Sequence, residues 1–387
     1  MKKIAILDMW ASESTSKGPS KHWLYNKLAE SFDIDLITLP HSKLSDLSYM
    51  LRTFTPSRAR WGSKYHSLKE HANKTPALFK KHTAMFEQKL RSKKGRYDLF
   101  FQIGALCGPV ETYGVPYVSY HDQTVKMVEA QDLGWLMTNF RDFRDEWYAL
   151  EQTFYRSMTK IVTYSAYTQT SIVCDYAVPA ERVTVIPTAC KLSYPDKEKA
   201  LQPRKQQLLF VTTDFFRKGG DILLEAFPLI KAQIPDINLV IAGGRLPESV
   251  YLHDPAIKYV GVLSPADLKS YYLSSALLVH PARYDAFPNV LKEAMACGLP
   301  IVASASCGIP EMLEFGETGV ILKDNNPEEI AGSVCNILSD ESLYQRFQER
   351  SLDARERYRV DIICDKFVNL FTKCMNENPD RGAKIQR

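Results

Sequence analysis

The chain has 387 residues, of which 45% are hydrophobic and 24% are charged, and its formal net charge is +4. This length exceeds what one typical hydrophobic core needs, so we expect two domains. The composition is that of an ordinary soluble globular protein. The sequence contains no long-period repeat, no low-complexity tract and no apolar run of membrane-spanning length.

The N-terminal half alternates apolar segments with segments of helical spacing. A helix is expected over 21–29, and strands are expected over 3–8, 33–39, 97–103, 115–120, 159–164 and 182–187. This repeated strand–helix–strand order is typical of a parallel sheet with helices on both faces. The first apolar segment stops at Asp8, too early for the core of a signal peptide, so it is interpreted as a buried strand.

The same alternation restarts after 190–206, a polar segment with two prolines that suits a linker between domains. It predicts strands over 208–211, 237–242, 258–261, 276–280 and 299–303, helices over 219–232 and 289–297, and a mostly helical region over 327–375. We therefore expect an N-terminal domain over 1–190, a C-terminal domain over 206–362, and a last helix with a frayed tail over 363–387.

Eight cysteines occur without a Cys-x-x-Cys pair, and Cys and His do not cluster in the way that zinc ligands do. Free thiols in a chain without a secretion signal favour a reducing compartment. We therefore expect a cytoplasmic protein.

The segment from Val279 to Ser304 is the most informative one. A strand ends there at His280, a short loop includes Asp285, and a helix begins near Pro288-Asn289. Unpaired amides and the positive end of that helix would form an anion site suited to a diphosphate. Glu293, in about the first turn, could accept both hydroxyls of a ribose. Taken alone, its position is better explained by complementation of the helix dipole.

A second candidate site follows the first strand of the C-terminal half, at Arg217-Lys218-Gly219-Gly220. Two cations beside two glycines at a strand-to-helix turn can meet a pyrophosphate without steric hindrance. For an arbitrary Arg-Lys pair taken alone, a solvated basic turn is the better explanation.

Together these segments resemble the retaining nucleotide-sugar glycosyltransferases of glycosyltransferase family 4. The family signature is Glu-x7-Glu, and here Asp285 and Glu293 occupy the two positions, the first shorter by one methylene. The resemblance implies that Glu293 binds the nucleotide ribose and Asp285 contacts the donor sugar. It also implies that the segment between them supplies contacts to phosphate and sugar, through Phe287, Pro288, Asn289 and Val290.

The resemblance includes the family motif Arg-x(4 or 5)-Lys-Gly, which binds the donor diphosphate. Lys218 matches the lysine, whereas threonines stand in the place of the arginine, and Arg217 is the candidate replacement. Gly243, in the turn after the next strand, is added to the expected donor site. In the N-terminal half, Gly18 is what remains of the family's Gly-Gly pair at the donor phosphate.

His121 ends a strand of the N-terminal half and resembles the family histidine that approaches the donor sugar and the leaving diphosphate. A lone histidine at a strand end is more often structural, but the matching context favours a catalytic role. His280 has no such support and is expected only to end its strand.

The resemblance implies two facing Rossmann-like domains, the GT-B architecture, with the last helices crossing back to the N-terminal domain. The implied reaction is a retaining transfer from a nucleotide-sugar donor to a hydroxyl of a glycan, glycolipid or other acceptor. No metal or other cofactor is expected, and Asp33-Ile34-Asp35 is interpreted as part of a strand. A nicotinamide-dependent oxidoreductase would need Gly-x-Gly-x-x-Gly after a strand, which neither half has. A catalytically impaired nucleotide-sugar-binding protein is the alternative.

Basic charge is concentrated in 52–96, which contains thirteen Lys or Arg and two acidic residues, with aromatic residues interleaved. One interpretation is a solvated surface whose aromatic side chains turn into the core. The other is a surface for an anionic acceptor, or for the inner leaflet that carries a lipid-linked acceptor, which would make the protein peripheral to a membrane. No nucleic-acid partner is expected, because neither a stacking platform nor a recognition helix is apparent.

Overall fold

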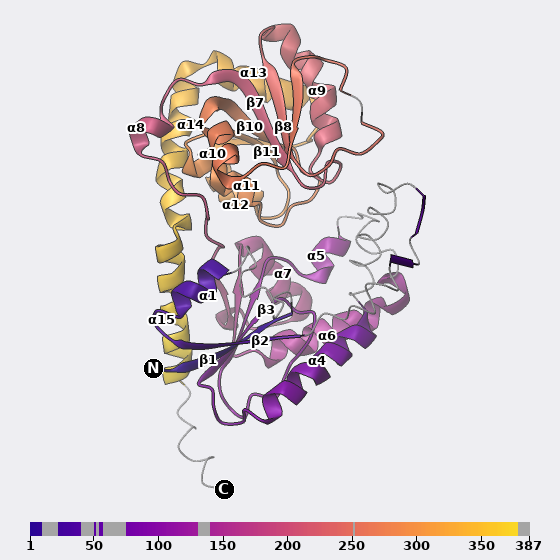
Figure 1. Ribbon diagram of the computed structural model, residues 1–387, viewed down its shortest axis with the longest axis vertical. Helices are drawn as coiled ribbons and strands as arrows, with labels where there is room; N and C mark the ends of the chain where they lie inside the picture. Colours follow the sequence, from indigo (N-terminus) through magenta and orange to yellow (C-terminus); the bar gives the residue numbers. More distant parts are fainter. Residues whose placement is uncertain are drawn as a thin grey trace. The chain divides into compact units, whose positions relative to one another are not determined.

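The computed structural model describes residues 1–9, 22–39, 50–51, 54–56, 75–130, 140–250 and 252–377. The chain divides into two compact units, whose elements are labelled in Figure 1. The N-terminal unit comprises Met1–Tyr164, Thr168–Ile186 and Cys364–Arg387, and the C-terminal unit comprises Ser165–Tyr167 and Pro187–Ile363.

The described part of the N-terminal unit is built on a parallel six-stranded sheet of order β2-β1-β3-β4-β5-β6. All six strands predicted in this half are confirmed: β1 (Lys3–Asp8), β2 (Asp33–Thr38), β3 (Leu99–Ile103), β4 (Tyr117–His121), β5 (Lys160–Thr163) and β6 (Val183–Val185). Every residue of β3 and β4 is buried. Strands buried on both faces read as continuous apolar runs, which is why the sequence located them well.

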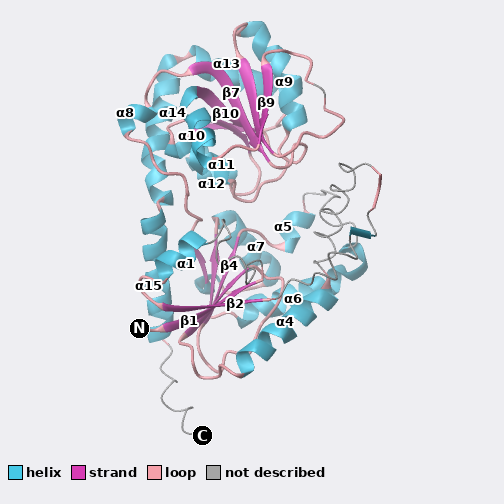
Figure 2. Ribbon diagram, in the orientation of Figure 1, coloured by secondary structure: helices cyan, strands magenta, loops and turns pink. Residues whose placement is uncertain are grey.

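Helices cover both faces of this sheet, as Figure 2 shows: α1 (His22–Leu28), α4 (Pro76–Arg91), α5 (Val125–Glu129), α6 (Arg144–Ser157) and α7 (Ala166–Tyr176). Helix α4 begins where the Thr75 hydroxyl accepts a hydrogen bond from the amide of Leu78 at 3.3 Å and Pro76 occupies the first position. It packs on α6 through Phe79 and Trp147, whose ring centroids are 5.9 Å apart. Short 3-10 turns occur at Phe140–Phe143 and Ala180–Arg182.

The described part of the C-terminal unit holds a second parallel six-stranded sheet, of order β12-β11-β10-β7-β8-β9. Five of its strands confirm the prediction: β7 (Lys205–Thr212), β8 (Asn238–Gly243), β9 (Ile257–Gly261), β10 (Ser275–His280) and β11 (Ile301–Ser304). The sixth, β12 (Gly319–Leu322), was not predicted. It is a four-residue edge strand that starts with a glycine, and a Cβ on Gly319 would come within 2.5 Å of the Ile301 carbonyl oxygen.

The C-terminal sheet is also covered on both faces (Figure 2). Its helices are α8 (Lys197–Ala200), α9 (Gly220–Gln233), α10 (Pro265–Ser274), α11 (Asn289–Ala296), α12 (Ile309–Met312), α13 (Pro327–Ser339) and α14 (Glu341–Ala354), with 3-10 turns at Glu314–Gly316 and Arg355–Tyr358. Helices α9 and α11 begin within one residue of their predicted starts. The helical character predicted for 327–375 is confirmed as well.

The last helix, α15 (Val360–Asn376), crosses back to the N-terminal unit as predicted. From Cys364 onward its residues belong to that unit. Phe367 and Phe371 pack against Phe101 of β3, with ring centroids 5.7 and 5.1 Å apart. No helix within the described ranges combines the length and apolar character needed to cross a membrane.

Candidate functional site

The candidate site lies where three strands of the C-terminal sheet end. Lys218 follows β7, Gly243 ends β8, and Asp285 follows β10, just before α11. The carboxyl ends of parallel strands meet at one edge of a sheet. Strands β7 and β10 are neighbours in the sheet although they are not consecutive in the chain. Such a reversal of strand order opens a crevice at that edge, where ligands bind in open α/β folds.

The Asp285 carboxylate is held from two sides. Its Oδ2 forms an ion pair with Lys218 Nζ and lies 3.1 Å from His280 Nε2. His280 is 1% exposed, and the side chains of Lys218 and Asp285 are 10% and 16% exposed. Lys218, His280 and Asp285 are called the carboxylate cluster below.

Burial and pairing act in opposite directions on these groups. Burial alone would raise the pKa of Asp285, but the hydrogen bond with His280 and the charge of Lys218 outweigh it and bring that pKa to about 2. Burial lowers the pKa of His280, against its hydrogen bond with Asp285. At neutral pH we therefore assign an ionised Asp285 and a neutral His280 that donates its Nε2 proton to Asp285. Burial also lowers the pKa of Lys218, which Asp285 partly offsets.

The guanidinium of Arg217 forms hydrogen bonds with groups outside the carboxylate cluster. Its Nε donates to Asp214 Oδ2 at 3.1 Å and its Nη1 donates to the Tyr284 carbonyl at 3.2 Å, while its own carbonyl accepts from the amide of Arg283 at 2.9 Å. These bonds tie the turn after β7 to the loop after β10. Arg217 thus stabilises the backbone on either side of Lys218 and Asp285, and its predicted contact with a diphosphate stays a prediction.

Two glycines allow the backbone to pack tightly at this edge. Gly219 has φ +74°, and a Cβ there would lie 1.9 Å from the Pro281 carbonyl oxygen. Gly243 has φ +122°, and a Cβ there would lie 1.9 Å from the Thr212 carbonyl oxygen. Only glycine fits both positions. The tight backbone packing therefore explains by itself why a glycine stands at position 243, independently of any contact with a ligand.

The loop before α11 presents backbone to the same edge. Phe287 and Pro288 are buried, Asn289 is exposed and begins the helix, and Val290 follows it. Pro288 occupies the N-cap position, and no side chain there accepts a hydrogen bond from the first helical amides. These amides and the helix dipole make the helix start a ready anion site.

Glu293 lies deeper in α11 than the sequence suggested. It is the fifth residue of the helix, so it belongs to the second turn rather than the first. Dipole complementation at the helix start, the alternative explanation of this acid, is therefore weakened. Burial raises the pKa of Glu293, against the hydrogen bond that the Tyr272 hydroxyl donates to its Oε2 at 2.8 Å. One carboxylate oxygen is thus held in place by Tyr272.

Two further residues of this region were missed by the sequence analysis. His280 was expected only to end β10, but it orients Asp285. Lys292 is 1% exposed, donates from Nζ to the carbonyl of Thr188 at 3.1 Å, and lies 5.4 Å from the centroid of the Phe287 ring. Burial lowers the pKa of Lys292 to about 7. A histidine before a proline and a lysine within a helix give no local sign of such contacts.

The remaining predicted site residues lie apart from this cluster in the chain. His121 ends β4 of the N-terminal unit, is 2% exposed, and makes edge contacts with the rings of Phe154 and Tyr155 at 5.8 and 5.1 Å. These contacts describe a well-packed histidine, and its catalytic role stays a prediction. Gly18 lies outside the described residues.

The basic segment 52–96 is described only at 54–56 and 75–96. In that part Lys80 pairs with Glu146 at 2.6 Å and Lys93 pairs with Asp35 at 2.8 Å. Phe79 and Phe86 are buried, which agrees with the interpretation that aromatic side chains turn into the core. The docking interpretation concerns mostly residues outside the description and stays a prediction.

Most of the C-terminal unit is similar in sequence to known glycosyltransferases. Residues 195–353 match the family model for glycosyl transferases group 1. An uncharacterized glycosyltransferase of Haemophilus influenzae is 28% identical over 45% of this chain and 51% of its own length. The chain thus spans about half the length of that curated relative. The matched segment contains every residue of the carboxylate cluster.

Solved structures share the fold of nearly the whole chain. Sucrose-phosphate synthase from Thermosynechococcus elongatus has a TM-score of 0.69 at 19% identity, covering 97% of this chain and 100% of that one. Anabaena Alr3699/HepE, solved in complex with UDP-glucose, has a TM-score of 0.62 at 16% identity, with 96% and 100% covered. At these identities the likeness concerns the fold, and it confirms the predicted GT-B class.

Proposed function

We propose that this chain is a retaining glycosyltransferase that moves a sugar from a nucleoside-diphosphate sugar to a hydroxyl of a glycan, glycolipid or other acceptor. The observation that carries the proposal is the carboxylate cluster beside the start of α11, within the segment that matches the group 1 glycosyltransferases.

The diphosphate is proposed to lie between Lys218 and the first amides of α11. Both are cationic or positively polarised and both lie at the edge where β7 and β10 end. In the described structure the Lys218 ammonium is paired with Asp285. An arriving diphosphate offers that ammonium a stronger anion, which frees one side of the Asp285 carboxylate to accept hydrogen bonds from hydroxyls of the donor sugar. His280 would keep the carboxylate oriented during this exchange.

The nucleoside is proposed to bind through Glu293. Tyr272 holds Oε2 of this carboxylate at 2.8 Å, which leaves Oε1 for a ribose hydroxyl. Because Glu293 is buried, an ionised carboxylate there gains from every hydrogen bond that a ribose supplies. A ligand that brings two hydroxyls therefore suits this position.

The chemical step would be a displacement on the face from which the diphosphate leaves. The bond from the anomeric carbon to the phosphate oxygen breaks, the bond to the acceptor oxygen forms on the same face, and the leaving phosphate takes the acceptor proton. Lys218 and the amides of α11 would stabilise the growing charge on the diphosphate without a metal. Binding of the acceptor, and membrane docking through 52–96, stay predictions.

Titration with nucleoside diphosphates tests this proposal. Since Alr3699/HepE was solved with UDP-glucose, UDP is the first ligand to test, followed by GDP and ADP, with uridine as the uncharged comparison. We expect one diphosphate to bind and its sugar conjugate to be hydrolysed slowly or transferred. Binding without any turnover on a panel of donors and acceptors would favour the catalytically impaired alternative. If no nucleoside diphosphate binds, the proposed function is wrong.

A further inference from the structure

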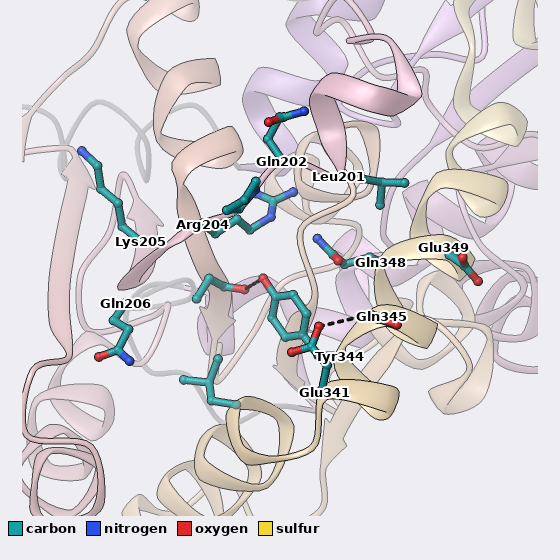
Figure 3. Close-up of a pocket in the computed structure, with 13 residues that line it drawn as sticks. Leu201, Gln202, Arg204, Lys205, Gln206, Glu341, Tyr344, Gln345, Gln348 and Glu349 are labelled. Carbon is teal, nitrogen blue, oxygen red and sulfur yellow. Dashed lines mark hydrogen bonds between the residues drawn. The ribbon is translucent and has the colours of Figure 1, made fainter.

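The C-terminal unit has a second hollow at the opposite edge of its sheet from the candidate donor site. It has a volume of about 580 Å³ and is bordered by the residues that start β7 and β10 and by one face of α14 (Figure 3). Strand β7 has eight residues, so at about 3.3 Å per residue the two edges are about 20 Å or more apart. The hollow, called the amino-edge pocket, is therefore a separate site with a volume typical of small-molecule sites.

One side chain in this pocket lacks a partner. Gln348 on α14 is 7% exposed, and its amide makes no hydrogen bond with any residue in the described ranges. Figure 3 shows this amide directed into the pocket beside the ring of Tyr344. The amide nitrogen and oxygen remain accessible from the pocket although the rest of the residue is buried. A ligand with both donors and acceptors would satisfy it.

The charges around the pocket argue against an anionic ligand. Arg204 borders it, but its two Nη atoms donate to six backbone carbonyls at 2.7 to 3.2 Å: Ala200, Tyr272, Leu273, Ser275, Cys297 and Gly298. The positive charge of Lys205 is offset by the negative charges of Glu341 and Glu349, which line the same pocket. Phosphate recognition needs free converging cations, and the described lining does not provide them.

The rest of the lining suits a neutral ligand rich in hydroxyls. Gln206 adds an amide that can both donate and accept. Gln202 and Gln345 already donate from Nε2, to the Glu198 carbonyl at 3.2 Å and to Glu341 Oε1 at 2.7 Å, and each keeps a second N–H and an amide oxygen. Tyr344 donates its hydroxyl to the Ala276 carbonyl at 3.0 Å, so its ring supplies the apolar surface and its polar end is already satisfied. Amides and carboxylates can form hydrogen bonds with the hydroxyls of a sugar, and an aromatic ring can pack against its apolar face. The lining is therefore complementary to a sugar.

We propose that the amino-edge pocket binds a neutral oligosaccharide, at a site separate from the proposed donor site. The inference goes beyond the proposed function, because it rests on the lining of this pocket and on nothing at the carboxyl edge. A saccharide held there would keep a glycan chain attached to the protein independently of the donor.

The test uses ligand-observed NMR with the full chain and four neutral trisaccharides: maltotriose, cellotriose, mannotriose and chitotriose. We expect at least one to bind with a dissociation constant of about 1 mM or lower. Saturating UDP and inorganic phosphate should not displace it. Gln348→Leu should weaken binding about tenfold, because it removes the amide that faces the pocket while keeping a similar volume.

Gln88→Leu is the matched control, since Gln88 is an exposed residue of α4 in the other unit and its substitution should leave binding unchanged. If Gln348→Leu does not fold, the double variant Gln206→Ala, Gln345→Ala changes only exposed side chains and should weaken binding in the same way. No binding by any trisaccharide, displacement by UDP or phosphate, or wild-type binding by the pocket variants would overturn the proposal. Saccharide binding that persists when UDP fails to bind would reject the proposed function and leave this inference standing.

Discussion

The two units use the same alternation of strands and helices but wind their sheets differently. The N-terminal sheet has the order β2-β1-β3-β4-β5-β6, and the C-terminal sheet has the order β12-β11-β10-β7-β8-β9. The strand order therefore reverses between β1 and β3 in the first unit and between β7 and β10 in the second. The first arrangement is flavodoxin-like, whereas the second is that of dinucleotide-binding folds.

This difference decides which loops can form a site together. In the C-terminal unit the reversal brings Lys218, after β7, next to Asp285, after β10, across 67 residues of chain. In the N-terminal unit the loop that leaves the reversal after β1 runs into residues outside the description. Asp8, which ends β1 at this reversal, is buried and accepts a hydrogen bond from the Tyr25 hydroxyl at 2.7 Å. A second buried acid, Glu151, lies within α6 and is held by two tyrosines, Tyr155 and Tyr176. Both units thus have an acid where the strand order reverses, and the described part of the N-terminal unit has a further one inside its core.

The largest effect is expected from Asp285→Asn, which tests the acid at the crevice. The substitution removes the ion pair with Lys218, and we expect kcat to fall about a hundredfold or more, with a smaller change in donor affinity. Asp285→Glu should retain part of the activity. Steady-state kinetics with the donor found by titration provide the measurement, and Asp236→Asn, at an exposed position, is the control. Wild-type kinetics for Asp285→Asn would exclude a role for this carboxylate.

The acid in the core of the N-terminal unit should lower the stability of that unit as the pH rises from 4.5 to about 7. Burial raises the pKa of Glu151 to about 7 from 4.5, although Tyr176 and Tyr155 donate hydrogen bonds to it. The folded protein then holds this proton more tightly than the unfolded chain, so the contribution of Glu151 to stability is present at low pH and is lost as the pH rises from 4.5 to about 7. The loss corresponds to about 3 kcal/mol. The depressed pKa of Asp285 acts oppositely, and its contribution is lost only as the pH falls from 3.8 towards about 2.

Glu151→Gln should therefore remove the loss of N-terminal stability that Glu151 causes between about pH 5 and about pH 8. All five tryptophans occur within the first 147 residues, so tryptophan fluorescence during urea unfolding reports on the N-terminal unit. Measurements at about pH 5 and about pH 8 give the difference. Asp285→Asn should leave that difference unchanged. A variant Glu151→Gln with the full wild-type difference would show that another group is responsible.

Lys218→Ala tests the proposal that Lys218 binds the diphosphate whereas other groups at the crevice bind the nucleoside. It removes a charge-assisted contact, so binding of a nucleoside diphosphate should weaken by roughly 1.5–3 kcal/mol, whereas binding of the nucleoside should hardly change. Calorimetric titrations with UDP and uridine measure the two effects. Lys258→Ala, on the exposed face of β9, serves as the control. Equal losses for both ligands would contradict a phosphate contact.

Two glycine substitutions compare the tightness of backbone packing at the strand ends of the two units. Gly243→Ala would place a Cβ 1.9 Å from the Thr212 carbonyl oxygen, whereas Gly104→Ala, with φ +79°, would meet nothing within 4 Å. Both strain the backbone, by about 1–3 kcal/mol. Gly243→Ala must also move β8 away from β7 and should be the more destabilising. Unfolding followed by circular dichroism compares them, and an equal or larger loss for Gly104→Ala would refute the packing argument.

The smallest effect is expected from chelation. Lys218 and the amides of α11 are proposed to stabilise the leaving diphosphate, so transfer should continue in the presence of EDTA. The measurement is initial rate with and without EDTA, then with magnesium restored. Complete inhibition that magnesium reverses would mean that a metal, and not this edge of the C-terminal unit, stabilises the diphosphate.

Much of the fold and part of the site followed from local features of the sequence. Apolar runs bounded by turn residues located eleven of the twelve strands in the described ranges, most clearly those buried on both faces, because such a strand leaves its pattern in consecutive residues. The short edge strand β12 carries too little of that pattern. The start of α11 and the positions of Lys218, Asp285 and Glu293 were also recognisable, because each belongs to a short segment with its own spacing.

Only the tertiary structure decided which of these segments meet. The alternation is the same for either strand order, so it did not indicate that the turn after β7 would face the loop after β10. His280 and Lys292 acquire their contacts through that arrangement: one reaches Asp285 when the loop folds back, and the other reaches the Thr188 carbonyl from 104 residues away. The amino-edge pocket likewise forms only when α14 packs beside the start of β7. Local periodicity reflects burial of each element, whereas these contacts depend on how distant elements pack together.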